Sequence, residues 1–220
     1  MAKKVFNLFI LDESGSMESI AGQTISSYNE LIQTVKNSET RHPEQAQYIT
    51  LVTFNGNGIK TVFDNAPIGH INGFTEKDYK PDATTPLWDA VGFSVTRLAQ
   101  ALTDEKDAVV LVSILTDGFE NASQEFSAEQ VKHLVQKYSA NDWVFTFIGA
   151  GDDVFRQAAE IDIPRGNALR STYTDLKNST INLACNMETL HEVASRRDIK
   201  PAFWAKFKSN FFEWDGEEEE

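Results

Sequence analysis

The apolar run from Ala108 to Leu115 constrains the fold more than any other segment of the chain. It shows no regular alternation of apolar and polar residues, which is typical of a strand buried on both faces of a parallel sheet. A second run of this kind extends from Trp143 to Ile148. Each run is followed by a segment in which apolar residues have helical spacing. The sequence therefore predicts an α/β protein built from strand–helix units.

The N-terminal half repeats this pattern and adds a hairpin. A strand is predicted over residues 5–11, followed by an amphipathic helix whose apolar residues recur every three or four positions between Ile25 and Val35. A second strand is predicted over residues 48–54, and the turn Asn55-Gly56-Asn57-Gly58 leads into a third that ends at Phe63. The predicted architecture is a doubly wound, mostly parallel sheet with one antiparallel edge strand and helices on both faces.

The other segments complete the alternation. Residues 64–82 are predicted to form a long loop, after which Thr85 and Pro86 are typical of a helix start with proline at the first helical position. Ser127 and Gln130 have the spacing of a capping box, which predicts a helix through Tyr138. The last predicted elements are a helix at about 154–160, a short strand at about 168–173 and a helix from about 175 to 196.

No linker interrupts the chain before residue 197, so residues 1–196 are predicted to form one domain and residues 197–220 a C-terminal extension. The extension has six aromatic residues between positions 203 and 214, and six of its last eight residues are acidic. The aromatic residues are expected to pack on the domain or at a contact between copies, with a partner-docking peptide as the alternative. The sequence does not specify an oligomeric state.

The charge of the chain excludes one class of partner. There are 20 Lys and Arg against 33 Asp and Glu, a formal net charge of −13, whereas nucleic-acid binding needs clustered positive charge. No membrane partner is expected, because the apolar run near the N-terminus is too short to span a bilayer and lacks a signal-peptide cleavage site. The single cysteine, Cys185, excludes an internal disulfide. These features predict a cytoplasmic protein.

Oxygen-bearing side chains stand where three of the predicted elements begin or end. Asp12, Ser14 and Ser16 follow the first strand, Thr85 precedes a helix, and Asp117 follows the apolar run at 108–115. Because ligands of doubly wound sheets bind at the carboxyl ends of the strands, these side chains are expected to converge. Two carboxylates and three hydroxyls, without histidine or cysteine, suit a hard cation such as Mg²⁺, Mn²⁺ or Ca²⁺.

Three motifs around these residues carry a resemblance: Phe-Ile-Leu-Asp-Glu-Ser-Gly-Ser-Met at 9–17, Thr-Thr-Pro-Leu-Trp-Asp-Ala at 84–90 and Leu-Thr-Asp-Gly at 115–118. Over about residues 3–190 the chain resembles a von Willebrand factor type A domain of the stand-alone bacterial kind. The resemblance implies a metal-ion-dependent adhesion site made by Asp12, Ser14, Ser16, Thr85 and Asp117.

The same resemblance implies a function. It implies a non-enzymatic module that binds a protein partner with the help of a divalent cation, whose coordination is completed by an acidic residue of the partner. The chain departs from the family at Ala83 and Thr84, where two glycines usually precede the threonine.

Other interpretations of these residues remain open. Asp12 and its two serines are compatible with a polar turn that caps the next helix, and Thr85 is an equally good N-cap. The alternative function is a Mg²⁺-dependent phosphoryl-transfer or hydrolytic enzyme at the same site. Such an enzyme needs a general base, for which Glu120 and Asp152 are the candidates. Otherwise Glu120 and Asn121 are expected to be solvated loop residues, with a supporting role behind the metal ligands as the alternative.

Two further catalytic or cofactor patterns are incomplete. Ser14 lacks the Gly-x-Ser-x-Gly elbow of a hydrolase nucleophile. Gly149-Ala150-Gly151 follows a strand as a dinucleotide-binding loop does, but the third glycine position is Val154. The sequence therefore predicts no catalytic residue and no nucleotide site.

Overall fold

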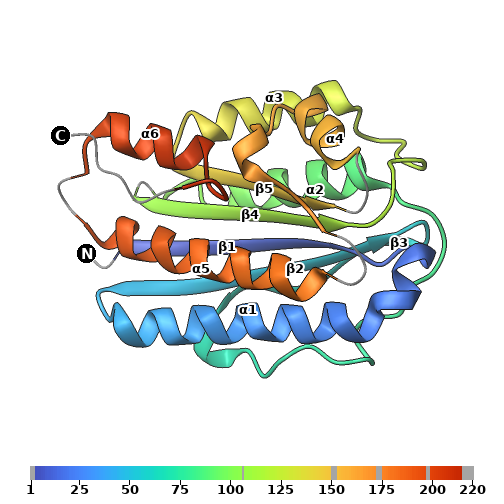
Figure 1. Cartoon of the computed structure of the whole chain (residues 1–220), viewed down its shortest axis with the longest axis horizontal. Helices are drawn as coiled ribbons and strands as arrows, with labels where there is room; N and C mark the ends of the chain where they lie inside the picture. The colour runs from blue at the N-terminus through green and yellow to red at the C-terminus, as the bar shows by residue number, and fades with distance from the viewer. Residues whose placement is uncertain (1–2, 106, 150–152, 172–174, 197–198, 215–220) are drawn as a thin grey trace.

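The central strand β1 (Lys3–Asp12) organises the sheet of the computed structural model, which describes residues 3–105, 107–149, 153–171, 175–196 and 199–214. β1 pairs in parallel with β2 (Gln45–Asn55) on one side and with β4 (Ala108–Thr116) on the other. β5 (Trp143–Gly149) and β6 (Ala168–Arg170) continue the sheet beyond β4. At the opposite edge, β3 (Gly58–Pro67) pairs antiparallel with β2. The strand order is β3-β2-β1-β4-β5-β6, so the predicted sheet is confirmed (Figure 1).

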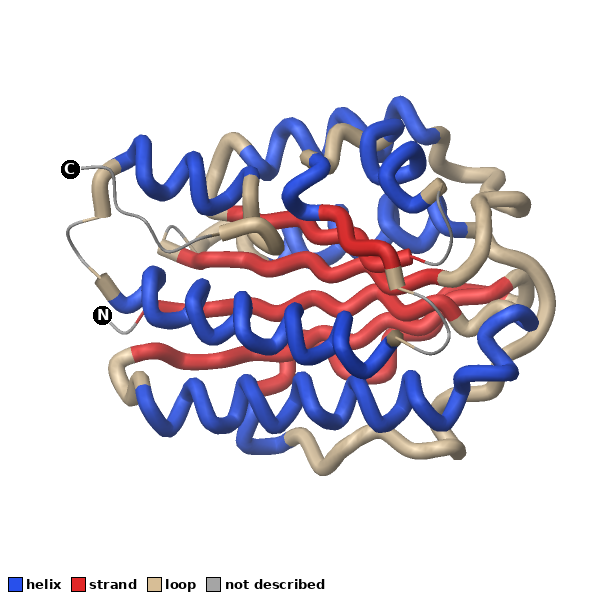
Figure 2. Tube along the Cα trace, viewed as in Figure 1, coloured by secondary structure: helices blue, strands red, loops and turns tan. Residues whose placement is uncertain are grey.

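Helices cover both faces of this sheet (Figure 2). α1 (Ala21–Arg41) and α5 (Leu176–Ser195) lie side by side over one face. The opposite face is covered by three helices: α2 (Leu87–Ala101), α3 (Ala128–Ser139) and α4 (Val154–Glu160). Short 3₁₀ helices occur at Gly15–Ile20, Ile68–His70 and Arg165–Asn167. None of the helices within the described ranges has the length and apolar character that crossing a membrane requires.

The side chains of β4 show why the run at 108–115 does not alternate. Val109 and Leu111 belong to the core beneath α1 and α5, whereas Val110, Val112 and Ile114 belong to the core beneath α2, α3 and α4. All five are at most 1% exposed. Both faces of the strand are therefore buried, and every position favours an apolar residue.

Several element boundaries differ from the sequence prediction, and two of them lie close to the sheet edge and the candidate site. The loop predicted from residue 64 begins only after the 3₁₀ helix at Ile68–His70, because β3 continues to Pro67. Thr50 and Asn65 join β2 to β3 across an irregular register: the backbone N–H of Asn65 donates to Thr50 Oγ1 at 3.0 Å. At the start of α2, Pro86 is the N-cap residue and Thr85 does not cap the helix. The capping box of Ser127 and Gln130 is confirmed.

The C-terminal extension contains a helix that the sequence analysis did not predict, α6 (Pro201–Ser209). It packs against β5, and its Phe207 joins Phe211 as a fully buried part of the core that α1 and α5 cover. The backbone N–H of Phe211 donates to Asn167 Oδ1 at 2.8 Å. The expected packing of aromatic residues on the domain is observed for these two phenylalanines. The domain boundary at residue 196 stays a prediction, and most of the acidic tail, residues 215–220, lies outside the described residues.

Candidate metal centre

The candidate site lies at the carboxyl ends of β1 and β4, at the right-hand edge of the sheet in Figure 1. The strand order reverses here, since the connection from β1 leads to β2 on one side and β4 lies on the other. Asp12 is the last residue of β1, Asp117 directly follows β4, and Thr85 precedes α2. The three predicted motifs therefore reach the same edge of the sheet, at its topological switch point.

Direct contacts bring the predicted side chains together. The backbone N–H of Ser14 donates to Asp12 Oδ1 at 2.7 Å, which closes the turn after β1. Ser14 Oγ lies 3.2 Å from Ser16 Oγ, and Ser16 Oγ donates to Asp117 Oδ1 at 2.5 Å. The chain of contacts thus runs from β1 to the residue after β4, and it places two carboxylates and two hydroxyls beside one another.

Thr85 lies close to the same group, on the far side of Gly118 from Asp12. A β-carbon on Gly118 would lie 3.0 Å from Thr85 Oγ1 and 3.7 Å from Asp12 Oδ2. Glycine is therefore needed where the loop after β4 passes between Thr85 and Asp12. All five residues named from the sequence converge on one place.

Asp12 carries the most unusual electrostatics of the site. Its side chain is fully buried, and Thr116 Oγ1 donates to its Oδ2 at 2.5 Å. Burial, with a smaller contribution from the charge of Asp117, outweighs the hydrogen bonds from Thr116 and Ser14 and raises the pKa of Asp12 to about 6. No Lys or Arg forms an ion pair with Asp12 anywhere in the described ranges. A buried carboxyl group without a positive partner is costly, and a bound cation would remove that cost.

Ala83 and Thr84, the two residues before Thr85, stand where the family usually has glycine. The structure shows how each is accommodated. Ala83 has a φ of 62°, the left-handed conformation that glycine adopts without strain. Thr84 is accommodated because its neighbour in the β2–β3 turn is Gly56, where a β-carbon would come within 2.2 Å of Thr84 Oγ1. The backbone is therefore strained at Ala83, and Gly56 provides the space that Thr84 occupies.

Residues after Gly118 hold the Thr85 loop. Asn121 is exposed, as expected of a loop residue, but it also supports the site: its Oδ1 accepts the Thr85 N–H at 2.9 Å, and its own N–H donates to the Thr85 carbonyl at 3.2 Å. Glu120 accepts backbone N–H groups of Trp88, Ala122 and Ser123. Both of its carboxylate oxygens therefore hold the loop, while Asp152, the other candidate base, lies outside the described residues.

Sequence reasoning missed three supporting residues. Thr116 precedes Asp117 directly, so its position at the strand end was a usable signal. Tyr79 donates its hydroxyl to the Asp12 carbonyl at 2.5 Å from a distant loop, which no local pattern indicates. Asp89 of α2 accepts three backbone N–H groups, those of Gln124, Glu125 and Phe126, at 2.7–2.9 Å. Thr116 fixes the Asp12 side chain, and Tyr79 and Asp89 fix the backbone of the site.

The donor set fits a hard divalent cation. Asp12, Ser14, Ser16, Thr85 and Asp117 offer carboxylate and hydroxyl oxygens, the ligands that Mg²⁺, Mn²⁺ and Ca²⁺ prefer. The described part of the chain has no cluster of three or more His, Cys, Asp or Glu. A site with two carboxylates carries only two negative charges, which leaves a bound cation electrophilic toward an oxygen from outside the chain.

Comparison with known families and structures identifies the class of protein. The family model for the von Willebrand factor type A domain matches residues 8–184, and the chain belongs to that family. The family is known for metal-dependent protein interactions. No curated protein sequence matches the chain.

Solved structures share the fold at low sequence identity. The von Willebrand factor domain of the type V pili tip protein Mfa5 from Porphyromonas gingivalis is 9% identical, with a TM-score of 0.61 over 92% of this chain and 100% of that one. Proximal thread matrix protein 1 from the mussel byssus is 15% identical, with a TM-score of 0.56 over 85% of this chain and 46% of that one. Manganese-loaded TRAP protein of Plasmodium vivax is 16% identical, with a TM-score of 0.50 over 83% and 74%. The chain spans less than half the length of the mussel protein.

Proposed function

We propose that this protein is a divalent-cation-dependent protein-binding module, whose metal site is formed by Asp12, Ser14, Ser16, Thr85 and Asp117. The observation that carries the proposal is the convergence of these five side chains around a fully buried carboxyl group that lacks a positive partner. A family relative that is loaded with manganese, the TRAP protein, supports a cation in a domain of this fold.

Each residue of the site has a definable part in binding. Asp12 is held by Thr116 and by the Ser14 backbone, so it is preorganised and buried, whereas Ser16 is exposed and Asp117 is only partly buried. The open side of the site is therefore the side of Ser16 and Asp117. When bound, a divalent cation supplies an electrophilic centre for a carboxylate of the partner, and Mg²⁺ or Mn²⁺ is the proposed ion.

The contacts of the described residues do not favour the enzymatic alternative. Glu120 is the candidate general base that lies within the described residues. It already accepts three backbone N–H groups and the hydroxyl of Ser123 at 2.6 Å. A carboxylate in this position organises a loop, and a general base needs a free lone pair directed at the reacting proton.

Thermal unfolding of the purified chain with and without metal tests the proposal. A cation that binds only the folded state stabilises it by about 2.7 kcal/mol when its free concentration is a hundred times its Kd. We expect the Tm to rise with Mg²⁺ or Mn²⁺ and to return on chelation. Asp117→Ala should abolish the rise, whereas Asp104→Ala, which removes an exposed carboxylate remote from the site, should keep it.

The same variants distinguish a cation site from a set of turns and caps. Asp117→Ala removes one of two neighbouring negative charges, so the metal-free fold should be as stable as the wild type or more so. If metal leaves the wild-type Tm unchanged and Asp117→Ala simply destabilises the protein, the residues are structural and the proposal is wrong.

A further inference from the structure

A groove of about 840 Å³ lies on the α2 side of the sheet, between that helix and the β2–β3 hairpin. α2 packs against β1 and β2, whereas Ile59 and Thr61 of the edge strand β3 keep solvent access on this side. Thr50 and Val52 of β2 complete the floor. The groove exists because the helical layer on this face ends at β2 while the sheet continues for one more strand.

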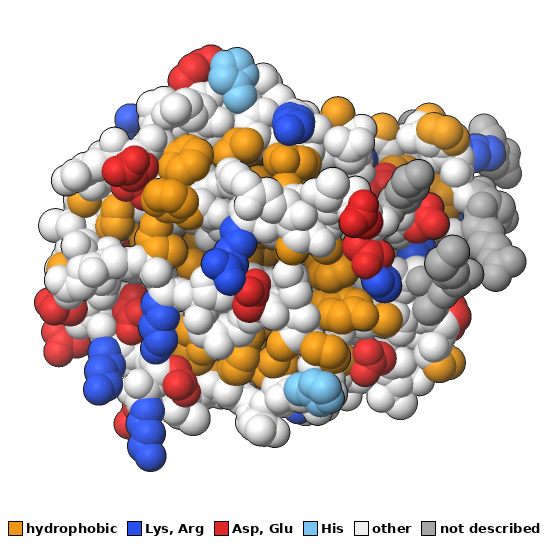
Figure 3. Space-filling model, turned by 180° about the vertical axis from the view of Figure 1, so that it is seen from behind, with side chains coloured by type: hydrophobic (Ala, Val, Ile, Leu, Met, Phe, Trp, Pro, Cys, Tyr) orange, Lys and Arg blue, Asp and Glu red, His pale blue; other side chains and the backbone are white. Residues whose placement is uncertain are grey.

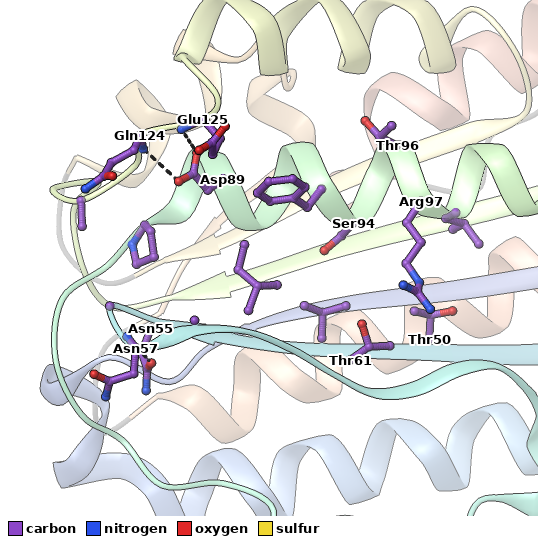
Figure 4. Close-up of a pocket in the computed structure, with 18 of the residues that line it drawn as sticks. Thr50, Asn55, Asn57, Thr61, Asp89, Ser94, Thr96, Arg97, Gln124 and Glu125 are labelled. Atoms are coloured by element: carbon purple, nitrogen blue, oxygen red, sulfur yellow. Dashed lines mark hydrogen bonds between the residues drawn. The ribbon is translucent and has the colours of Figure 1, made fainter.

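One end of the groove reaches the candidate metal centre. It carries Asn55 and Asn57, lies on the left in Figure 4, and is called the upper end of the groove. Thr84 and Pro86, the two neighbours of Thr85, line the groove, together with Asn55 and Asn57 from the β2–β3 turn. Gly56 of the same turn makes the close approach to Thr84 described above. A ligand lying in the groove would therefore end beside the loop that carries Thr85, and the two surfaces are continuous.

The lining of the groove is rich in polar groups, some of which are already occupied. Thr50 and Thr61 project from the strands, and Ser94 and Arg97 project from α2 toward them (Figure 4). The Ser94 hydroxyl is buried below the groove surface, and the Thr50 hydroxyl is hydrogen-bonded to Asn65. Thr61 is exposed, so its hydroxyl is open to a ligand. Phe93 adds an apolar surface at the wall, since its side chain is 45% exposed and its ring packs edge-to-face against Phe126.

This chemistry favours an extended polypeptide over a helix. A docked amphipathic helix needs a continuous apolar groove, whereas an extended segment uses backbone donors and acceptors together with small pockets. Figure 3 shows that hydrophobic side chains on the back of the molecule lie in separate patches, interrupted by charged residues. A segment that follows the strands from Asn57 to Asp64 would cover about 3.3 Å per residue and use seven or so residues.

The charges of the groove specify the segment further. At the end of the groove away from the metal centre, Arg97 and Asp64 form an ion pair at 2.6 Å, so their charges neutralise one another. Asp89 is occupied by three backbone N–H groups. Glu125, at the upper end, is exposed and has no ion-pair partner among the described residues. The upper end therefore complements a positive side chain.

We propose that the groove binds an extended segment of the protein partner, in which a Lys or Arg lies close in sequence to the acidic residue that reaches the metal centre. Glu125 contacts the basic side chain, Thr61 hydrogen-bonds to the backbone, and Phe93 covers an apolar side chain of the segment. This inference rests on the proposed metal-dependent binding and adds the class of partner that the site selects.

Selection from a phage-displayed peptide library tests the inference with the full chain. Each displayed peptide has about 12 residues, enough to fill the groove, and contains one fixed glutamate. Selection in Mg²⁺ should enrich Lys or Arg within a few positions of that glutamate. A selected peptide is then synthesised, and its affinity is measured by fluorescence anisotropy.

Variants in the groove provide the decisive comparison. Thr61→Trp fills the groove from an exposed strand position, and Glu125→Lys reverses the charge at its upper end. Each should weaken binding of the peptide by about tenfold or more, while leaving the Mg²⁺-induced rise in Tm intact. Thr40→Trp, the same substitution at an exposed position on α1, should leave the affinity unchanged.

The outcomes separate this inference from the proposed function. If the metal raises the Tm but selection enriches no peptide, or if Thr61→Trp and Glu125→Lys leave peptide affinity unchanged, the groove inference is overturned and the metal site stands. If the metal does not raise the Tm of the wild type, the proposed function fails without reference to any peptide. Peptide binding that survives chelation would overturn the link between the groove and the metal.

Discussion

The two ends of β1 hold buried polar groups of opposite character. Near the amino end of the sheet, Asn7, Gln45, Gln47 and His191 form an amino-edge cluster in which every side chain is at most 3% exposed. Gln47 Nε2 donates to Gln45 Oε1 at 2.9 Å, and Gln45 Nε2 donates to the His191 carbonyl at 2.6 Å. At the carboxyl end, Asp12 is equally buried but ionisable, and its partners are hydroxyl and N–H groups.

The difference teaches which end is built for an external ligand. In the amino-edge cluster the neutral amides hydrogen-bond to one another, and His191 Nδ1 is the one buried side-chain atom of the cluster without a partner among the described residues. Asp12 is also hydrogen-bonded, but a buried carboxyl group beside a second carboxylate breaks the rule that buried charges are paired, and local rules are most often broken at functional sites. The two ends therefore contribute differently to stability: the amino-edge cluster with or without a cation, and the carboxyl edge chiefly when a cation is present.

The largest expected effect comes from making the amino end resemble the carboxyl end. Asn7 Nδ2 donates to Gln47 Oε1 and to the Tyr48 carbonyl, both at 3.3 Å. Asn7→Asp replaces this donor with an acceptor and places a carboxylate beside the carbonyl oxygens of Gln47 and Tyr48 and the neutral ring of His191, whose Nε2 lies 3.4 Å from Asn7 Oδ1. We expect a loss of about 3–5 kcal/mol in the free energy of unfolding at neutral pH, the cost of an uncompensated buried charge, measured by urea denaturation.

The reciprocal change on the same strand is the control. Asp12→Asn keeps the shape of the side chain but removes its charge. It should leave the metal-free protein as stable as the wild type or more so, and abolish the Tm response to Mg²⁺. If both substitutions destabilise the metal-free protein equally, the two ends of β1 do not differ in the way described here.

The next effect concerns pH at the amino-edge cluster. Burial, together with smaller contributions from the neighbouring His42 and Arg41, lowers the pKa of His191 to about 3. Because the folded pKa lies below the unfolded value of about 6.5, the stability that neutral His191 contributes is complete above pH 6.5. It is lost toward pH 3 at about 1.4 kcal/mol per pH unit.

The matched variant isolates this titration from that of the carboxylates. His191→Gln cannot be protonated, so between pH 7 and pH 5 the wild type should lose about 2 kcal/mol more than the variant in the free energy of unfolding. Urea denaturation at several pH values measures the difference. Parallel pH profiles for the two proteins would show that His191 is not buried in the neutral form.

Much of the fold was predictable because strand burial leaves a strong pattern. The run at 108–115 predicted a strand buried on both faces, and the Asn55–Gly58 turn predicted the antiparallel edge; the sheet confirms both. Helix α6 was not predicted, although Phe203, Trp204 and Phe207 have helical spacing, because the helix has only nine residues and only Phe207 is buried within it. Its position depends on tertiary contacts such as that of Trp204 Nε1 with Asp142 at 2.7 Å.

The candidate site shows the same limit at the scale of single residues. The five proposed ligands were predictable, because they stand at strand ends in recognisable motifs and strand ends meet at one edge. Tyr79 was not, since it acts through one hydrogen bond to the backbone of a residue far away in the sequence. The groove was also not predictable, because it depends on where the α2 layer ends relative to β3.

The smallest expected effect concerns backbone strain, which the carboxyl edge contains at Ala83. A left-handed alanine costs roughly 1–2 kcal/mol, and glycine removes that cost but loses about 0.5–1 kcal/mol of chain entropy. We therefore expect Ala83→Gly to raise the free energy of unfolding slightly, whereas Ala205→Gly, at an exposed position within α6, should lower it by about 0.5–1 kcal/mol. Urea denaturation of both variants measures the contrast. Equal losses in the two would mean that Ala83 is unstrained, and that the family's glycine at this position is needed for a reason other than its backbone conformation.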